Sequence, residues 1–284
     1  MSTTTPPAPS SGPSLLDKTT LLSLASTLFL LLTALALSHL VLPPQQTTRP
    51  RLRALFVWHA FDALIHFVLE GSFVYHCLFT SARIDTLQGF FFSSPLGKGG
   101  YVADPVNFLG GGGEGGGGWK VAHGAQAGVV RAAAAAAAAG EGASGGGGIG
   151  GMMAGLWMVY ARADSRWAGV DLTVLSLEIL TVVFGGTMAC LVCYDIAKKN
   201  PRANLGMVIL ATAELYGGYM TFMPEWLTGS VNLDTSNFMY KWIFLIFFNA
   251  LWVVMPLYAI YVAADDISDA FRARATALGE KKAK

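Results

Sequence analysis

Charged side chains are scarce in this chain. Asp, Glu, Lys and Arg make up 13% of its 284 residues, whereas hydrophobic residues make up 53%. A soluble globular domain carries about 25% charged residues, so this composition excludes an ordinary soluble protein and indicates an integral membrane protein. The net charge of +1 argues against nucleic acid as a partner, because proteins that bind nucleic acids carry clustered basic surfaces.

Cysteine is also rare. The three cysteines, Cys77, Cys190 and Cys193, lie in apolar segments, and an odd number there does not make a disulfide framework. Cys190 and Cys193 form a C-x-x-C pair without a second ligand pair, which we interpret as packing rather than metal or redox chemistry. The glycine runs lack both the G-K-[ST] end and the leading strand of a phosphate-binding loop. We therefore predict neither a metal nor a cofactor.

The chain contains several long runs of apolar residues. Five of them are long enough to cross a bilayer, which takes about 20 residues. They are residues 20–42, 52–77, 171–196, 204–222 and 239–263. These runs predict an all-α fold, namely a polytopic bundle of five transmembrane helices. We expect the first run to be a retained span rather than a cleaved signal peptide, because its apolar core is longer than that of a secretory signal.

Three other segments differ in composition. Residues 1–19 are rich in Ser, Thr and Pro and predict a disordered tail. Residues 85–155 include GGGGEGGGG and eight consecutive alanines, which cannot bury a core and predict a flexible low-complexity insert. Residues 157–167 mix aromatic and charged side chains, so we expect Tyr160 and Trp167 to anchor this segment at the membrane interface.

Basic residues are distributed unevenly. The loops at 43–53 and 197–203 and the tail at 264–284 would share one side of the membrane, and they carry 11 of the 19 Lys and Arg residues. The positive-inside rule makes that side cytosolic and the N-terminus lumenal. The final residues, KKAK, resemble the dilysine retrieval signal of endoplasmic reticulum membrane proteins, so we expect that membrane as the location. An ordinary basic tail is the alternative.

The second span carries a polar stripe. At 100° per residue, His59, Asp62, His66 and Glu70 fall within about 80° of one helix face. A carboxylate at membrane depth costs roughly 2.5–3.5 kcal/mol, and such groups usually face a bundle interior or a cavity. This span is therefore the first candidate for a functional site.

Polar residues of four spans fall at a similar depth. At a rise of about 1.5 Å per residue, they lie about 10–20 Å from the lumenal ends of their spans: His66, Glu70, Glu178, Glu214, Asn249 and Trp252. We expect them to share one apolar pocket, suited to proton donation and removal on a lipophilic substrate. The alternative for each is a hydrogen bond that joins two helices, above all for Asn249 and Glu214.

Five short pieces of the sequence resemble the emopamil-binding protein family, which is defined by the EXPERA domain. They are IHFVLEG at 65–71, YARADSRW at 160–167, LEILT at 177–181, ELYGG at 214–218 and FNALWVVMP at 248–256. The resemblance covers about residues 50–77 and 156–263, in the same order. It identifies residues 50–263 as an EXPERA domain interrupted by the insert.

The resemblance implies a fold with an intramembrane sterol cavity and a function. Family members include the 3β-hydroxysteroid Δ8–Δ7 isomerases of sterol biosynthesis. They shift a double bond from C8=C9 to C7=C8 by protonation at C9, a carbocation at C8 and proton loss from C7, without a cofactor. The chain is thus expected to be an enzyme, an intramolecular isomerase, with a sterol as substrate, the bilayer around it and a homodimeric assembly.

The resemblance also implies roles for particular residues. The implied catalytic set is His66, Glu70, Glu178, Thr181, Asn249 and Trp252. Glu70 with His66 would deliver or relay the proton. Glu178, helped by Thr181, would stabilise the cation or exchange the proton, while Asn249 orients these groups and Trp252 faces the cation. Lining the cavity we expect Asp62, Glu214 and Tyr216.

Alternatives stay open at this point. A non-catalytic sterol- or amphiphile-binding EXPERA protein is the second reading, against which the complete residue set speaks. A proton-coupled transporter is the third, although the spans show no pairing of halves. Which carboxyl donates the proton is undecided. His59 and Asp62 stand where we expect apolar or small residues, so they either line the cytosolic half of the cavity or pair with a neighbouring helix.

Overall fold

The computed structural model describes residues 18–44, 50–79, 153, 156–157, 159–168, 171–236 and 238–282. Within these ranges the regular structure is helical, and the only strand-like feature is one isolated bridge between Asp164 and Leu233. Five helices are long and apolar enough to cross a membrane: Thr20–Val41, Pro50–Leu78, Leu172–Ala197, Arg202–Leu227 and Met239–Gly279. The predicted all-α fold with five spans is confirmed. The predicted tail at 1–19 and the insert at 85–155 lie outside the described residues, apart from their edges.

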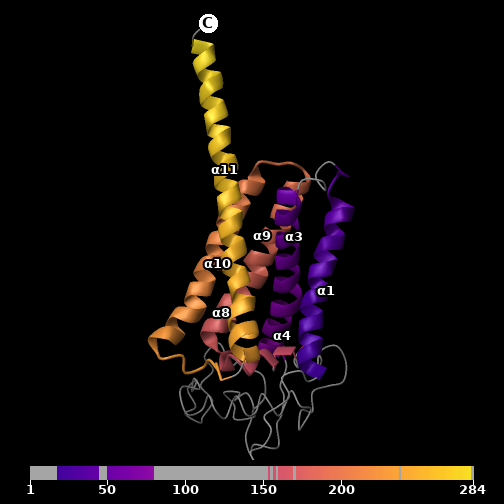
Figure 1. The fold of residues 1–284 in the computed structure, drawn as a ribbon, viewed down its shortest axis with the longest axis vertical. Helices are drawn as coiled ribbons and strands as arrows, with labels where there is room; N and C mark the ends of the chain where they lie inside the picture. Colours follow the sequence, from indigo (N-terminus) through magenta and orange to yellow (C-terminus); the bar gives the residue numbers. More distant parts are fainter. Residues whose placement is uncertain are drawn as a thin grey trace, which may run out of the picture.

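The five spans form one bundle (Figure 1). Helix α1 (Lys18–Val41) packs against α3 (Pro50–Leu64), and α3 packs in turn against α9 (Gly186–Ala197). Helix α10 (Arg202–Leu227) contacts both α9 and α11 (Phe248–Lys282). The main buried cluster joins apolar side chains of these helices, among them Leu55, Phe56, Met207 and Val262. Since the cluster lies between the helices, it sets their relative positions.

Three spans contain a π-helical segment. The second span continues from α3 through η1 (Ile65–Glu70) into α4 (Gly71–Phe79), and the third runs from α8 (Leu172–Leu180) through η4 (Thr181–Gly185) into α9. The fifth begins with η5 (Met239–Phe247), which leads into α11. Single π turns in helices occur frequently at functional sites. Each of these segments contains or closely precedes a residue of the predicted catalytic set.

The last helix extends well beyond the predicted span. Helix α11 continues to Lys282, whereas the apolar run ends near residue 263. Its final turns project past the bundle (Figure 1) and expose Phe271 and Leu278. The predicted cytosolic tail at 264–284 is therefore a continuation of the fifth helix as far as the structure describes it.

Residues 156–157 and 159–168, which precede the third span, close one end of the bundle, and we call them the closing segment. The rings of Trp157 and Trp167 stack with 5.0 Å between their centroids, and both contact Phe73 of α4. Arg166 donates to Asp164 at 2.6 Å and to the backbone oxygen of Thr221 on α10 at 2.7 Å. Tertiary contacts thus draw the aromatic side chains of this segment against the bundle. The expectation that Tyr160 and Trp167 anchor the segment at the membrane interface stays a prediction.

The Asp164–Arg166 pair supports a stability prediction. Burial raises the pKa of the Asp164 carboxyl, and the guanidinium of Arg166 opposes this rise. Removal of one partner of a buried ion pair leaves an uncompensated charge and costs about 3–5 kcal/mol. We expect Asp164→Ala to lower the thermal unfolding midpoint of the detergent-solubilised protein by several degrees.

The control for this prediction is Asp269→Ala. Asp269 forms a 3.2 Å pair with Arg272 on the projecting part of α11, and its side chain is 68% exposed. Exposed pairs contribute little to stability. An equal loss of stability in both variants would contradict a closing role for the buried pair.

Candidate active site

A cavity of about 800 Å³ is lined by residues from all five spans. Its volume is within the range of about 300–1,000 Å³ that is typical of pockets for small molecules. Apolar and aromatic side chains form most of its wall. The predicted site residues that line it are His66, Glu70, Glu178, Thr181, Glu214, Tyr216, Asn249 and Trp252. The structure thus brings residues separated by up to 186 positions in the chain around one space.

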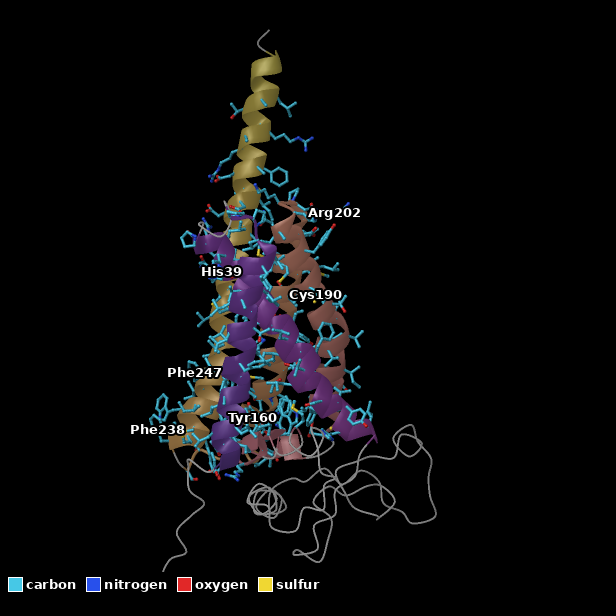
Figure 2. The ribbon with its side chains drawn as sticks, turned by 90° about the vertical axis from the view of Figure 1, so that its right-hand side faces the viewer. His39, Tyr160, Cys190, Arg202, Phe238 and Phe247 are labelled. Atoms are coloured by element: carbon cyan, nitrogen blue, oxygen red, sulfur yellow. The ribbon has the colours of Figure 1, made fainter. Side chains whose placement is uncertain are left out.

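The cavity lies toward one end of the bundle. Figure 2 shows Tyr160, one of its lining residues, near the same end as Phe238, whereas His39 and Arg202 lie at the opposite end. At this end of the bundle, Asp171 caps the N-terminus of α8, the helix that carries Glu178. The Asp171 carboxylate accepts hydrogen bonds from the backbone N–H groups of Thr173 and Val174 at 2.9 and 3.0 Å.

Glu70 is held from two sides. His66 Nδ1 lies 2.5 Å from Glu70 Oε2, and the hydroxyl of Thr181 donates to the same oxygen at 2.6 Å. Segment η1 supplies the first two residues, and Thr181 begins η4 on the facing helix. These two contacts on one oxygen fix the orientation of the Glu70 carboxyl group and join the two π segments.

Glu178 contributes a second carboxyl group to the same wall. Its side chain is 7% exposed, and its Oε2 has no hydrogen-bond partner among the described residues. Thr181 lies one turn further on and also donates to the backbone oxygen of Glu178 at 3.1 Å. Buried polar atoms without a partner are costly and call for an explanation. A proton or a substrate group at the cavity would supply the missing interaction.

Asn249 is fixed by the protein itself. Its amide nitrogen lies 3.1 Å from the Tyr160 hydroxyl, 3.1 Å from the backbone oxygen of Phe244 and 2.9 Å from that of Leu245. Burial raises the pKa of the Tyr160 phenol, and Asp164 adds to the rise, so this hydroxyl keeps its proton at neutral pH. The amide therefore ties the π segment η5 to the closing segment.

Asp62 does not line the cavity, contrary to expectation. It is fully buried, and its Oδ1 accepts from the indole N–H of Trp252 at 3.0 Å. This bond to α11 holds Asp62 behind the cavity wall, so of the two options for this residue the pairing with a neighbouring helix is the one observed. The indole ring of Trp252 packs edge-on against Trp58, with 5.4 Å between centroids, and also lines the cavity.

Glu214 and Tyr216 line the cavity in different ways. Glu214 is 9% exposed, and neither of its carboxyl oxygens has a hydrogen-bond partner among the described residues. Tyr216 is 63% exposed and lies where the cavity meets the outer surface of α10. Glu214 is thus part of the buried polar layer, whereas Tyr216 belongs to its rim.

Sequence reasoning did not find two features of the site. Tyr160 holds Asn249, although its place in an aromatic and charged segment had suggested the membrane interface. Gly185 lets His66 approach the third span, because a Cβ at this position would lie 3.1 Å from His66 Nε2. The adjacent glycines Gly185 and Gly186 were the available signal for close helix contact.

One cluster could also hold a metal ion. Asp62, His66 and Glu214 each offer a ligand atom, and these atoms lie within 4.8 Å of one another. Two nearby atoms are already engaged, since Asp62 Oδ1 accepts from Trp252 and His66 Nδ1 contacts Glu70. The remaining atoms are buried and unpartnered among the described residues, which a shared proton would explain equally well.

Residues 152–263 match the family model described as EXPERA (EXPanded EBP superfamily). The resemblance to the EXPERA family is confirmed. The EXPERA match includes the spans that carry Glu178, Glu214 and Asn249. The second span, with His66 and Glu70, precedes it in the chain and is brought to it by the fold.

Several known proteins are similar to part of this chain. A 3-beta-hydroxysteroid-Delta(8),Delta(7)-isomerase of Cavia porcellus is 26% identical over 104 residues, which are 37% of this chain and 45% of that protein. A probable enzyme of the same name from Arabidopsis thaliana is 33% identical over 104 residues, 37% of this chain and 46% of its own length. Isomeliandiol synthase of Melia azedarach is 30% identical over 104 residues, 37% and 48% of the two chains. The chain thus spans about half the length of these relatives.

Proposed function

We propose that the chain is a sterol Δ8–Δ7 isomerase that shifts a ring double bond from C8=C9 to C7=C8. One observation carries the proposal: two carboxyl groups, Glu70 and Glu178, line one apolar cavity, with the Thr181 hydroxyl bonded to the first and one turn from the second. Two carboxyls at one cavity suit a reaction in which one proton is added and another is removed. The names of the sterol isomerases among its relatives support the same reading.

In this proposal Glu70 delivers the proton. His66 lies against its Oε2 and is the nearest source of a proton, while Thr181 keeps the carboxyl oriented. Protonation at sterol C9 leaves a cation at C8. Removal of the C7 proton then completes the double-bond shift, and we assign this step to Glu178.

The cycle must also return the proton from the acceptor to the donor. We assign this step to Thr181, because its hydroxyl contacts both the Glu70 carboxyl group and the backbone oxygen of Glu178. The cation itself is stabilised by a nearby carboxylate and by the face of Trp252, which contributes about 0.5–2 kcal/mol when desolvated. Low polarity around the cavity strengthens both interactions.

The membrane setting belongs to the same proposal. The end of the bundle with His39 and Arg202 (Figure 2) carries the basic loops, so we infer that it faces the cytosol and that the catalytic cavity lies toward the lumenal half. We propose the endoplasmic reticulum membrane as the location, because the proposed reaction belongs to sterol biosynthesis, and residues 50–263 as the EXPERA unit. The homodimer stays a prediction.

Complementation tests the function. The full chain is expressed in a yeast strain without its own Δ8–Δ7 isomerase, and the sterols are measured by mass spectrometry. We expect Δ7 sterols to return. If the protein is made and reaches the membrane but Δ8 sterols persist, the isomerase proposal is wrong and a sterol-binding role takes its place.

A further inference from the structure

Two acidic side chains lie on the side of His66 that faces away from Glu70. His66 Nε2 is 3.2 Å from Asp62 Oδ1, close enough for an ion pair but without hydrogen-bond geometry. Glu214 of α10 reaches the same place, since its carboxyl oxygen, one of Asp62 and a ring nitrogen of His66 lie within 4.8 Å of one another. The imidazole ring therefore stands between Glu70 on one side and an acidic pair on the other.

Both side chains of this acidic pair, Asp62 and Glu214, are buried. Asp62 is 0% exposed and Glu214 is 9% exposed. Asp62 Oδ2 and both carboxyl oxygens of Glu214 have no hydrogen-bond partner among the described residues. Two buried carboxyl groups at such a short distance cannot both be ionised without a large energetic cost. A pair of this kind therefore shares one proton.

The charges around His66 lead to the same conclusion. The titratable groups that interact with Asp62 are His59 and His66 on its own span, Glu214 on α10, and Cys190 and Cys193 on α9. Three carboxyls, Asp62, Glu70 and Glu214, surround the single imidazole ring of His66. Glu178 on the third span also interacts electrostatically with this ring. One imidazolium cannot balance so many buried carboxylates, so at least one carboxyl group around it carries a proton.

We propose that Asp62 and Glu214 form a proton-sharing acid pair that keeps a proton on His66 Nε2 and so directs the Nδ1 proton of the ring to Glu70. Both are positioning residues that act through His66, and the inference rests on the proposed isomerase function. When Nδ1–H passes to Glu70 Oε2, the ring becomes neutral and retains its Nε2–H toward Asp62. The shared proton stays between the two carboxyls, and the return of a proton to Nδ1 restores the starting state.

The arrangement explains why an aspartate is tolerated at the centre of an apolar span. Without Asp62, Glu214 would be the remaining acid of the pair beside Nε2. Gly185 also lies close to this side of the ring, since a Cβ added there would stand 3.1 Å from Nε2. Trp252 holds Asp62 in place through its indole N–H. The tryptophan thereby connects the substrate cavity with the acid pair behind it.

The first test reads the charge of His66 directly. The full chain, labelled with [15N]histidine, is purified in lipid nanodiscs, and the ring-nitrogen NMR signals of His66 are identified by their loss in His66→Gln. We expect both ring nitrogens to be protonated at pH 7 in the native chain and a neutral ring in Asp62→Asn. An imidazolium that persists unchanged in Asp62→Asn would overturn the proposal.

The second test uses kinetics. Asp62→Asn is expected to lower kcat by about 10–100-fold with KM within about three-fold. Glu214→Gln keeps a hydrogen-bond donor beside Asp62, so its maximal rate should fall less than about five-fold, but its pH profile should lose one ionisation. An unchanged pH profile in Glu214→Gln would refute the shared proton.

Thr212→Val is the matched control for both tests. Thr212 is an exposed residue of α10 whose hydroxyl donates to the backbone oxygen of Val208 at 2.7 Å. It should leave the NMR signals and the pH profile as they are. If the native chain does not isomerise sterols but the His66 signals respond as expected, the proposed function fails while the acid pair stands.

Discussion

Glu70→Gln is expected to reduce sterol conversion by about 10³-fold, within the range of about 10²–10⁴ that a positioned acid or base contributes. The amide is similar in shape, but it can neither take the proton from His66 nor pass it on. The 2.5 Å contact with His66 Nδ1 and the 2.6 Å bond from Thr181 both end on the carboxyl oxygen that this change affects. Turnover in detergent micelles, with the Δ8 and Δ7 sterols separated by gas chromatography, measures the effect.

The matched control for this change is Glu225→Gln. Glu225 is another buried glutamate, on α10, and it accepts from the side chain and the backbone N–H of Asn232 at 2.7 and 3.0 Å. We expect this variant to lose thermal stability but to keep kcat within about two-fold once folded. A Glu70→Gln protein that folds and turns over at the native rate would remove Glu70 from the mechanism.

Gly185→Val is expected to lower kcat by about 10²-fold through the position of His66. A Cβ at residue 185 would already lie 3.1 Å from His66 Nε2 and 3.2 Å from its Cδ2, and valine adds two methyl groups beyond it. The ring must then move away from the third span, and with it the contact to Glu70. A misplacement of about 1 Å at a reacting group costs on the order of 10²-fold in rate.

Gly71→Ala serves as the comparison for the glycine variant. A Cβ at residue 71 would lie 3.5 Å from the backbone oxygen of His66, which is ordinary van der Waals contact. Its kcat should remain within about two-fold of the native value. Equal loss in the two variants would mean that helix packing in general, rather than the position of the His66 ring, explains the effect of Gly185→Val.

The two glutamates of the cavity were visible in the sequence for a simple reason. A carboxyl group inside an apolar run is costly, so Glu70 and Glu178 stand out from their surroundings whatever the fold. Their depths along two different helices agree because both spans cross the same layer. The five spans were readable in the same way, since apolar runs of sufficient length need no knowledge of their neighbours.

Asp62 shows the limit of that reasoning. Helical periodicity placed it on the same face as His66 and Glu70, and this suggested the cavity wall. The indole N–H of Trp252, 190 residues away in the chain, holds it behind the wall instead. Tyr160 is a similar case, because its bond to Asn249 depends on how the closing segment folds back onto the fifth span.

The sequence by itself determined the five spans, the basic loops and the unusual acids within the membrane layer, because hydrophobicity and charge act residue by residue. Tertiary structure alone decided the π segments, the join of Glu70 to Thr181 and the meeting of Asp62, His66 and Glu214. These features depend on which helix faces which and on the rotation of each helix about its axis. Packing between distant segments sets both, and a local pattern of residues does not contain that information.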